Sequence, residues 1–131
     1  MKHAFKQKVY YSDTDSYGVV WHGSYLRWLE MGRIDLCAQT GQTVSELEKQ
    51  NVVLPVAEIN LKYKNPAKLD DVVLISTEIT EKSRCSITFH QAITDEKREK
   101  VYIEAIVKVV AIDKNGKLYR SLPEQLNSLI G

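Results

Sequence analysis

The sequence predicts an α+β fold in which one long helix packs against a curved, mainly antiparallel sheet of about five strands. Apolar residues recur at helical spacing over one long stretch, residues 22–40, whereas alternation with a period of two dominates after residue 51. The links between the expected strands are short, which implies antiparallel neighbours. A helix layer on a sheet layer is a stable way to bury the apolar face of each.

The size and charge of the chain fit one domain that spans residues 1–131. The sequence is 44% hydrophobic, enough for one core, and it is too short for two domains that fold independently. Its 18 basic and 17 acidic side chains nearly cancel. A general electrostatic affinity for nucleic acid or an anionic membrane is therefore not expected.

The ends and the cysteines indicate a cytoplasmic protein. The first residues lack the apolar core of a signal peptide, and no apolar run is long enough to span a membrane. Cys37 and Cys85 are too far apart in the sequence to form a CxxC pair. We expect both thiols to be reduced and buried.

The first half of the chain predicts a strand, a loop and the long helix. Residues 4–11 alternate as a half-buried strand does, and residues 12–18 are a cluster of turn formers. The helix is expected over residues 22–40, with Gly41 as its C-terminal cap. Its apolar stripe consists of Tyr25, Leu29, Gly32 and Leu36.

The second half predicts a short helix and then four strands. Thr43 and Glu46 have the spacing of a capping box, which favours a helix over residues 43–50. Asn115-Gly116 predicts a hairpin turn, and a short helix is expected after Pro123. The expected strands cover residues 57–64, 72–80, 85–94 and 101–112. Such a sheet leaves two edges and one face uncovered, so we expect a homodimer or homotetramer.

Two spaced motifs resemble a known family of enzymes. Residues 11–26 read Tyr-Ser-Asp-Thr-Asp-Ser-Tyr-Gly-Val-Val-Trp-His-Gly-Ser-Tyr-Leu, and residues 63–71 read Tyr-Lys-Asn-Pro-Ala-Lys-Leu-Asp-Asp. Together with the order of elements over nearly the whole chain, they are similar to the 4-hydroxybenzoyl-CoA thioesterase family and its YbgC-like acyl-CoA thioesterase branch. The resemblance implies a hotdog fold, with active sites at a dimer interface. It also implies that Asp15 is catalytic and that Tyr11 and His22 assist.

Elementary thioester chemistry agrees with these roles. Hydrolysis requires a group that activates or replaces water and a group that holds the charge growing on the carbonyl oxygen. The Asp15 carboxylate can attack the carbonyl carbon or take a proton from water, and the sequence leaves both routes open. The helix that begins near His22 offers unpaired amides and the positive end of its dipole, so the amide of His22 or Gly23 can donate to the oxyanion.

Other residues of the motifs have expected roles in binding or structure. Gly18 and Gly23 would let the acyl group approach the backbone, and Trp21 would line the acyl pocket. Glu30 and Arg33 are expected to form a structural ion pair. The basic candidates for the coenzyme A phosphates are Lys64, Lys82 and Arg84.

An alternative interpretation of the loop is a calcium site. Asp13, Asp15 and Gly18 match three positions of an EF-hand loop. Tyr17 and Ser24 occupy two of its ligand positions, so no metal is expected, and Asp13 is interpreted as structural.

The leading hypothesis is an acyl-CoA thioesterase that needs no cofactor and hydrolyses a small acyl- or aroyl-CoA thioester. An acyl carrier protein thioester is also open as substrate. The alternative function is a non-catalytic acyl-CoA-binding hotdog module, against which Asp15 argues. The histidine pattern of hotdog dehydratases is not found in the sequence.

Overall fold

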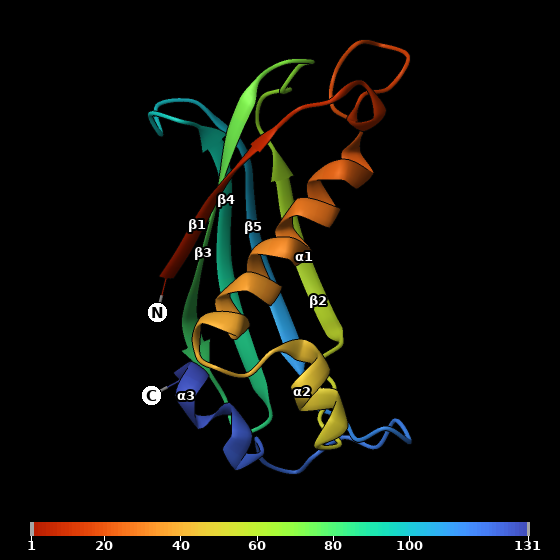
Figure 1. Cartoon of the computed structure of the whole chain (residues 1–131), viewed down its shortest axis with the longest axis vertical. Helices are drawn as coiled ribbons and strands as arrows, with labels where there is room; N and C mark the ends of the chain where they lie inside the picture. Colours follow the sequence, from red (N-terminus) through yellow and green to blue (C-terminus); the bar gives the residue numbers. More distant parts are fainter. Residues whose placement is uncertain (1, 131) are drawn as a thin grey trace.

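The computed structural model describes residues 2–130 and shows a five-stranded antiparallel sheet with a long helix across one face (Figure 1). The strand order is β1-β3-β4-β5-β2, so β1 and β2 are the edges. The predicted α+β architecture is confirmed. The elements are β1 (Lys2–Lys8), α1 (His22–Gln39), α2 (Val44–Lys49), β2 (Val56–Tyr63), β3 (Val72–Lys82), β4 (Ser86–Asp95), β5 (Val101–Val110) and α3 (Asn127–Ile130), with 3-10 helices at Tyr11–Asp13 and Glu124–Leu126.

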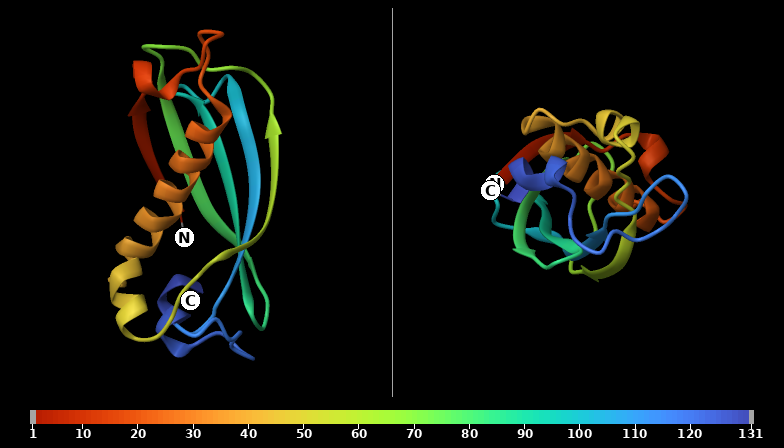
Figure 2. Two further views of the ribbon diagram at one scale, coloured as in Figure 1. Left: turned by 90° about the vertical axis from the view of Figure 1, so that its right-hand side faces the viewer. Right: turned by 90° about the horizontal axis from the view of Figure 1, so that it is seen from below.

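The core lies between α1 and the concave face of the sheet. Ile75, Ile93 and Ile103 are direct cross-strand neighbours on β3, β4 and β5, and all three are fully buried. Trp28 and Leu36 face them from the helix and are equally buried. Figure 2, seen from below, shows how the sheet curves around α1. The period-two pattern of the sequence therefore gives one apolar face, which the helix covers.

The helix approaches the sheet most closely at Gly32. A Cβ atom on Gly32 would lie 2.5 Å from Thr77 Oγ1, so any side chain there would push α1 away from β3. Beside this contact, the buried Gln91 amide donates to the Leu29 carbonyl at 2.8 Å and to Thr77 Oγ1 at 2.9 Å. Its Oε1 accepts a bond from Arg33 at 2.9 Å. This network fixes the middle of α1 over β3 and β4.

The first strand is shorter than the sequence predicts, and the physical cause is Asp13. The Asp13 carboxylate accepts the Tyr10 N–H at 2.9 Å, and the Asp13 N–H donates to the Tyr10 carbonyl at 2.9 Å. These bonds turn the chain into a 3-10 helix, so the strand ends at Lys8 and Tyr11 lies outside it.

The remaining element predictions are confirmed within a few residues. Thr43 caps α2 by accepting the Glu46 N–H at 3.1 Å, and a turn forms at Asn115-Gly116. The expected Glu30–Arg33 ion pair is wrong: no such pair occurs within residues 2–130, because the Arg33 guanidinium points to Gln91. In the same part of the chain, no helix is both long enough and apolar enough to cross a membrane.

Candidate active site

The loop before α1 holds the predicted catalytic residues at the N-terminal end of this helix (Figure 1). Asp13 fastens the loop there. Its carbonyl accepts the Trp21 N–H at 2.8 Å and the Ser24 hydroxyl at 3.0 Å. Its buried carboxylate binds the Tyr10 N–H and the guanidinium of Arg27. Asp13 is therefore a structural anchor between the loop and the first turns of α1.

Asp13→Asn tests this anchor. The amide retains an acceptor for the Tyr10 N–H but removes the charge that pairs with Arg27. We expect the free energy of unfolding to fall by about 1–2 kcal/mol, less than for a fully buried pair, because the Arg27 side chain is 61% exposed. Urea unfolding checks the value, and Arg27→Gln should give a similar loss that does not add to the first. A stable Asp13→Asn protein that has lost all activity would contradict a purely structural role.

The carboxylate of Asp15 is only half engaged. Its Oδ1 accepts the Tyr17 N–H at 2.8 Å, and in the described chain its Oδ2 has no hydrogen-bond partner. The backbone of Asp15 is held by the Val19 carbonyl at 2.9 Å and by the Gly18 N–H at 3.1 Å. Gly18 has φ +80°, a left-handed conformation that a residue with a Cβ atom rarely adopts. The tight turn thus presents one carboxylate oxygen to solvent.

Two backbone amides at the start of α1 are also unpaired. Trp21 N–H donates to Asp13 and Ser24 N–H donates to the Trp21 carbonyl at 2.9 Å, whereas the N–H groups of His22 and Gly23 find no acceptor among residues 2–130. The Trp21 ring lies over Gly23, where a Cβ atom would overlap it. It also lies 5.0 Å from the His22 ring, measured between centroids. Unpaired amides at the positive end of a helix are suited to hold an oxyanion.

The second motif forms a wall of the same site. Val20 N–H donates to the Ala67 carbonyl, and Ala67 N–H donates to the Tyr25 hydroxyl, both at 2.9 Å. Burial raises the pKa of the Tyr25 phenol, although the bond from Ala67 opposes this. The sequence predicts Tyr25 only as an apolar helix residue. The signal for its second role is that the two motifs occur together.

Other predicted site residues lie apart from Asp15. Tyr11 is 82% exposed, and its phenol makes no hydrogen bond to Asp15 in the part of the chain described. Lys64 forms an ion pair with Glu104 at 3.1 Å. Lys82 and Arg84 lie at the β3–β4 turn, at the opposite end of the sheet from the site loop (Figure 1).

The thiols do not supply a nucleophile to this site. Cys37 is buried as expected, and burial raises the pKa of its thiol to about 11, so it stays protonated at neutral pH. The expected burial of Cys85 is wrong in degree, because Cys85 lies in the β3–β4 turn instead of the strand and is partly exposed.

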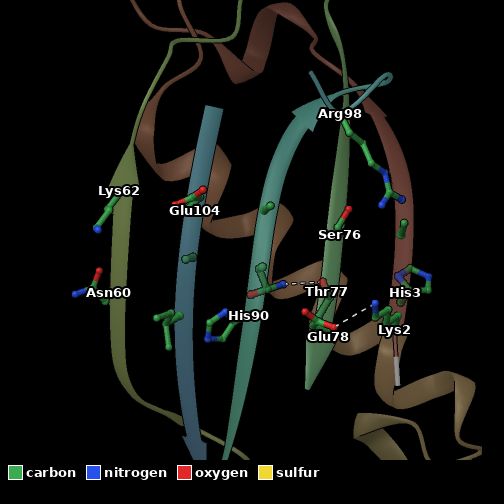
Figure 3. Close-up of a pocket in the computed structure, with 15 residues that line it drawn as sticks. Lys2, His3, Asn60, Lys62, Ser76, Thr77, Glu78, His90, Arg98 and Glu104 are labelled. Atoms are coloured by element: carbon green, nitrogen blue, oxygen red, sulfur yellow. Dashed lines mark hydrogen bonds and ion pairs between the residues drawn. The ribbon is translucent and has the colours of Figure 1, made fainter. Parts of the chain in front are cut away.

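The structure has two notable hollows, and Asp15 lines neither. One, of about 270 Å³, lies between α1, α2 and residues 52–56. The other, of about 570 Å³, lies on the sheet face away from α1. Figure 3 shows its mixed charge, with Lys2 paired to Glu78 at 3.6 Å and with His90 and Glu104 on neighbouring strands. The outer hollow is far from the unpaired amides of α1, so it is not the candidate catalytic site.

Comparisons with known proteins find similar chains. The profile of the thioesterase superfamily matches residues 17–102. The Acyl-CoA thioester hydrolase YbgC of Escherichia coli O6:H1 is 34% identical over 119 residues, or 91% of this chain and 88% of the relative. A probable thioesterase from Bartonella henselae is 29% identical with a TM-score of 0.87, over 94% of this chain and 100% of that one. A DHNA-CoA thioesterase from Staphylococcus aureus is 27% identical with a TM-score of 0.83, over 91% and 80%.

Proposed function

The chain belongs to the thioesterase superfamily and has the hotdog fold, and on that premise we propose that it is an acyl-CoA thioesterase whose catalytic carboxylate is Asp15. One observation carries the proposal. An unengaged carboxylate oxygen and two unpaired amides, those of His22 and Gly23, occur at the same end of α1. This is the pairing of groups that thioester hydrolysis requires. We further propose that residues 1–131 form one catalytic domain.

The proposed reaction converts an acyl-CoA and water to a carboxylic acid and coenzyme A. As a general base, Asp15 takes a proton from the water that attacks the carbonyl carbon, and the thiolate leaves with a proton. As a nucleophile, Asp15 forms an anhydride and releases the thiolate, and water then cleaves the anhydride. In both routes the carbonyl oxygen gains negative charge, which the His22 and Gly23 amides stabilise.

Assignments for the other residues follow from their places. Trp21 lies at the helix start, where it can cover the acyl group. The His22 ring lies beside Trp21 and can orient water. Tyr11 as a partner of Asp15 and Lys64, Lys82 and Arg84 as phosphate ligands stay predictions, as does the cytoplasmic location.

A thiol-release assay over a panel of CoA thioesters tests the proposed function. We expect the wild-type chain to release coenzyme A from at least one aliphatic or aromatic thioester. If it binds acyl-CoA but releases no thiol from any member of the panel, the chain is a binding module and the proposal is wrong.

Self-association is proposed through the β2 edge. This strand pairs with β5 on one side, and its other edge has no partner strand in the described chain. Its helix-facing side chains Val56, Ile59 and Tyr63 are exposed, whereas the β1 edge is protected by lysines. A second copy on β2 would cover these side chains. A tetramer would need a further contact, for which the mixed charges of the outer sheet face are a candidate.

Ile59→Glu is expected to weaken this association by about 100-fold or more, because it would bury an unpaired carboxylate at the interface. Light scattering coupled to size-exclusion chromatography measures the mass against concentration. The matched control is Asn60→Glu, on the opposite side of the same strand, which should stay associated. A monomeric wild-type chain would overturn the proposed interface.

A further inference from the structure

The hollow between α1, α2 and residues 52–56 has an apolar floor. Leu47, Val52, Phe89 and Val109 lie at its bottom, each at most 3% exposed. Its volume of about 270 Å³ exceeds that of a cavity that stays dry and binds benzene, roughly 150 Å³. Such a lining favours a hydrocarbon over water, because water would find few hydrogen-bond partners there.

The mouth of this hollow is apolar as well. Ile34 on α1, Val44 on α2 and Val56 on β2 line it, and all three are exposed. Figures 1 and 2 show the reason: α1 crosses the sheet obliquely and diverges from it toward its C-terminal end, where α2 closes the gap. An exposed apolar rim around a preformed apolar hollow is typical of a ligand site.

A continuous seam leads from the candidate catalytic site to the hollow. Along α1, the residues His22, Leu26, Glu30 and Ile34 follow at intervals of four and share one face. His22 and Ile34 are twelve residues apart, so the seam is about 18 Å long.

The other wall of the seam is β2, which runs in the matching direction. Its Tyr63 lies beside Tyr25 of the first helical turns, with ring centroids 6.0 Å apart, and its Val56 lines the hollow. Ile59 lies between them on the same side of the strand and is exposed. The seam therefore has exposed apolar side chains on both walls.

We infer that this hollow holds the distal end of an unbranched, long aliphatic acyl chain whose thioester lies at Asp15. The inference rests on the proposed function and specifies its substrate class. A compact aroyl group would stay near the first turns of α1, whereas a dodecanoyl or hexadecanoyl chain extends along the seam into the hollow. Glu30 and Arg33, at the helix side of the hollow, leave only its remaining, apolar wall for the chain.

Val44→Trp tests the inference by filling the mouth. We expect kcat/KM for hexadecanoyl-CoA to fall by about tenfold or more, since a pocket that loses room for even one methylene discriminates by about 10- to 200-fold. For butanoyl-CoA, which does not reach the hollow, the change should stay below about twofold. The matched control is Ser45→Trp, which puts the same side chain on the neighbouring, exposed position of α2 and should alter neither value.

A second measurement uses Cys37, which lines the hollow, and does not depend on catalysis. In a Cys85→Ser background at alkaline pH, dodecanoic acid should slow the reaction of Cys37 with a small disulfide reagent. The protection should disappear in Val44→Trp.

The outcomes separate the two proposals. Butanoyl-CoA hydrolysis with no long-chain hydrolysis, a Val44→Trp effect equal on both substrates, or absence of Cys37 protection would overturn the chain site and leave the thioesterase assignment intact. Absence of thiol release from every thioester would instead overturn the proposed function.

Discussion

Asp15→Asn is expected to lower kcat for CoA thioester hydrolysis by about 10²–10⁴-fold, the range for removal of a positioned acid–base group. The amide is nearly the same shape, and its oxygen can still accept the Tyr17 N–H that holds the turn. The folded structure should therefore survive, and the thermal midpoint should stay close to that of the wild type. What is lost is the charged oxygen that now has no partner in the described residues.

The comparison that isolates this effect is Ser16→Ala, a change in the same exposed turn that removes no group of the proposed mechanism. It should retain nearly full activity. If Asp15→Asn keeps most of its activity, another residue is the catalyst. A single turnover in oxygen-labelled water separates the two routes, because only the anhydride route can leave label on the Asp15 carboxylate.

Gly32→Ala is expected to destabilise the fold by about 2–4 kcal/mol, by overpacking and by disturbing the Gln91 bonds. The sign is informative, because replacing an exposed helical glycine with alanine stabilises by roughly 1 kcal/mol. Here the new methyl group would meet Thr77 Oγ1 at 2.5 Å and the Gln91 amide at 3.1 Å. Chemical and thermal unfolding measure the loss.

A double-mutant cycle with Thr77→Ala checks the cause. Removing the hydroxyl relieves the closest contact, so Gly32→Ala should cost less in that background, with an interaction energy of about 0.5–3 kcal/mol. Strictly additive costs, or a stabilised Gly32→Ala protein, would show that α1 does not rest on β3 as described.

The sequence predicts those parts of the fold that depend on local patterns. The helix of residues 22–39 and the four strands after residue 51 were expected because their apolar residues follow periods that the backbone itself imposes. Thr43 announces α2 because a cap acts over only three residues. The end of β1 depends instead on the Asp13 carboxylate, whose competing bond to the Tyr10 amide has no periodic signature.

The candidate site is predictable in its residues but not in its connections. Asp15, His22 and Gly23 follow from one continuous motif that ends in a helix start. The partner of Arg33 is Gln91, 58 residues away, and no spacing rule relates the two. The apolar hollow depends on the angle between α1 and the sheet, a property of the whole packing arrangement and not of any segment.

The bonds through Ala67 couple the local stability of two distant segments. Because Val20 and Tyr25 both bind Ala67, the loop that carries Asp15 can open only when the connection between β2 and β3 lifts away. This corner is then a small cooperative unit, distinct from the sheet core. Amide exchange in it would report on the readiness of the site, and a protease cut within residues 64–70 would disarm the chain without unfolding it.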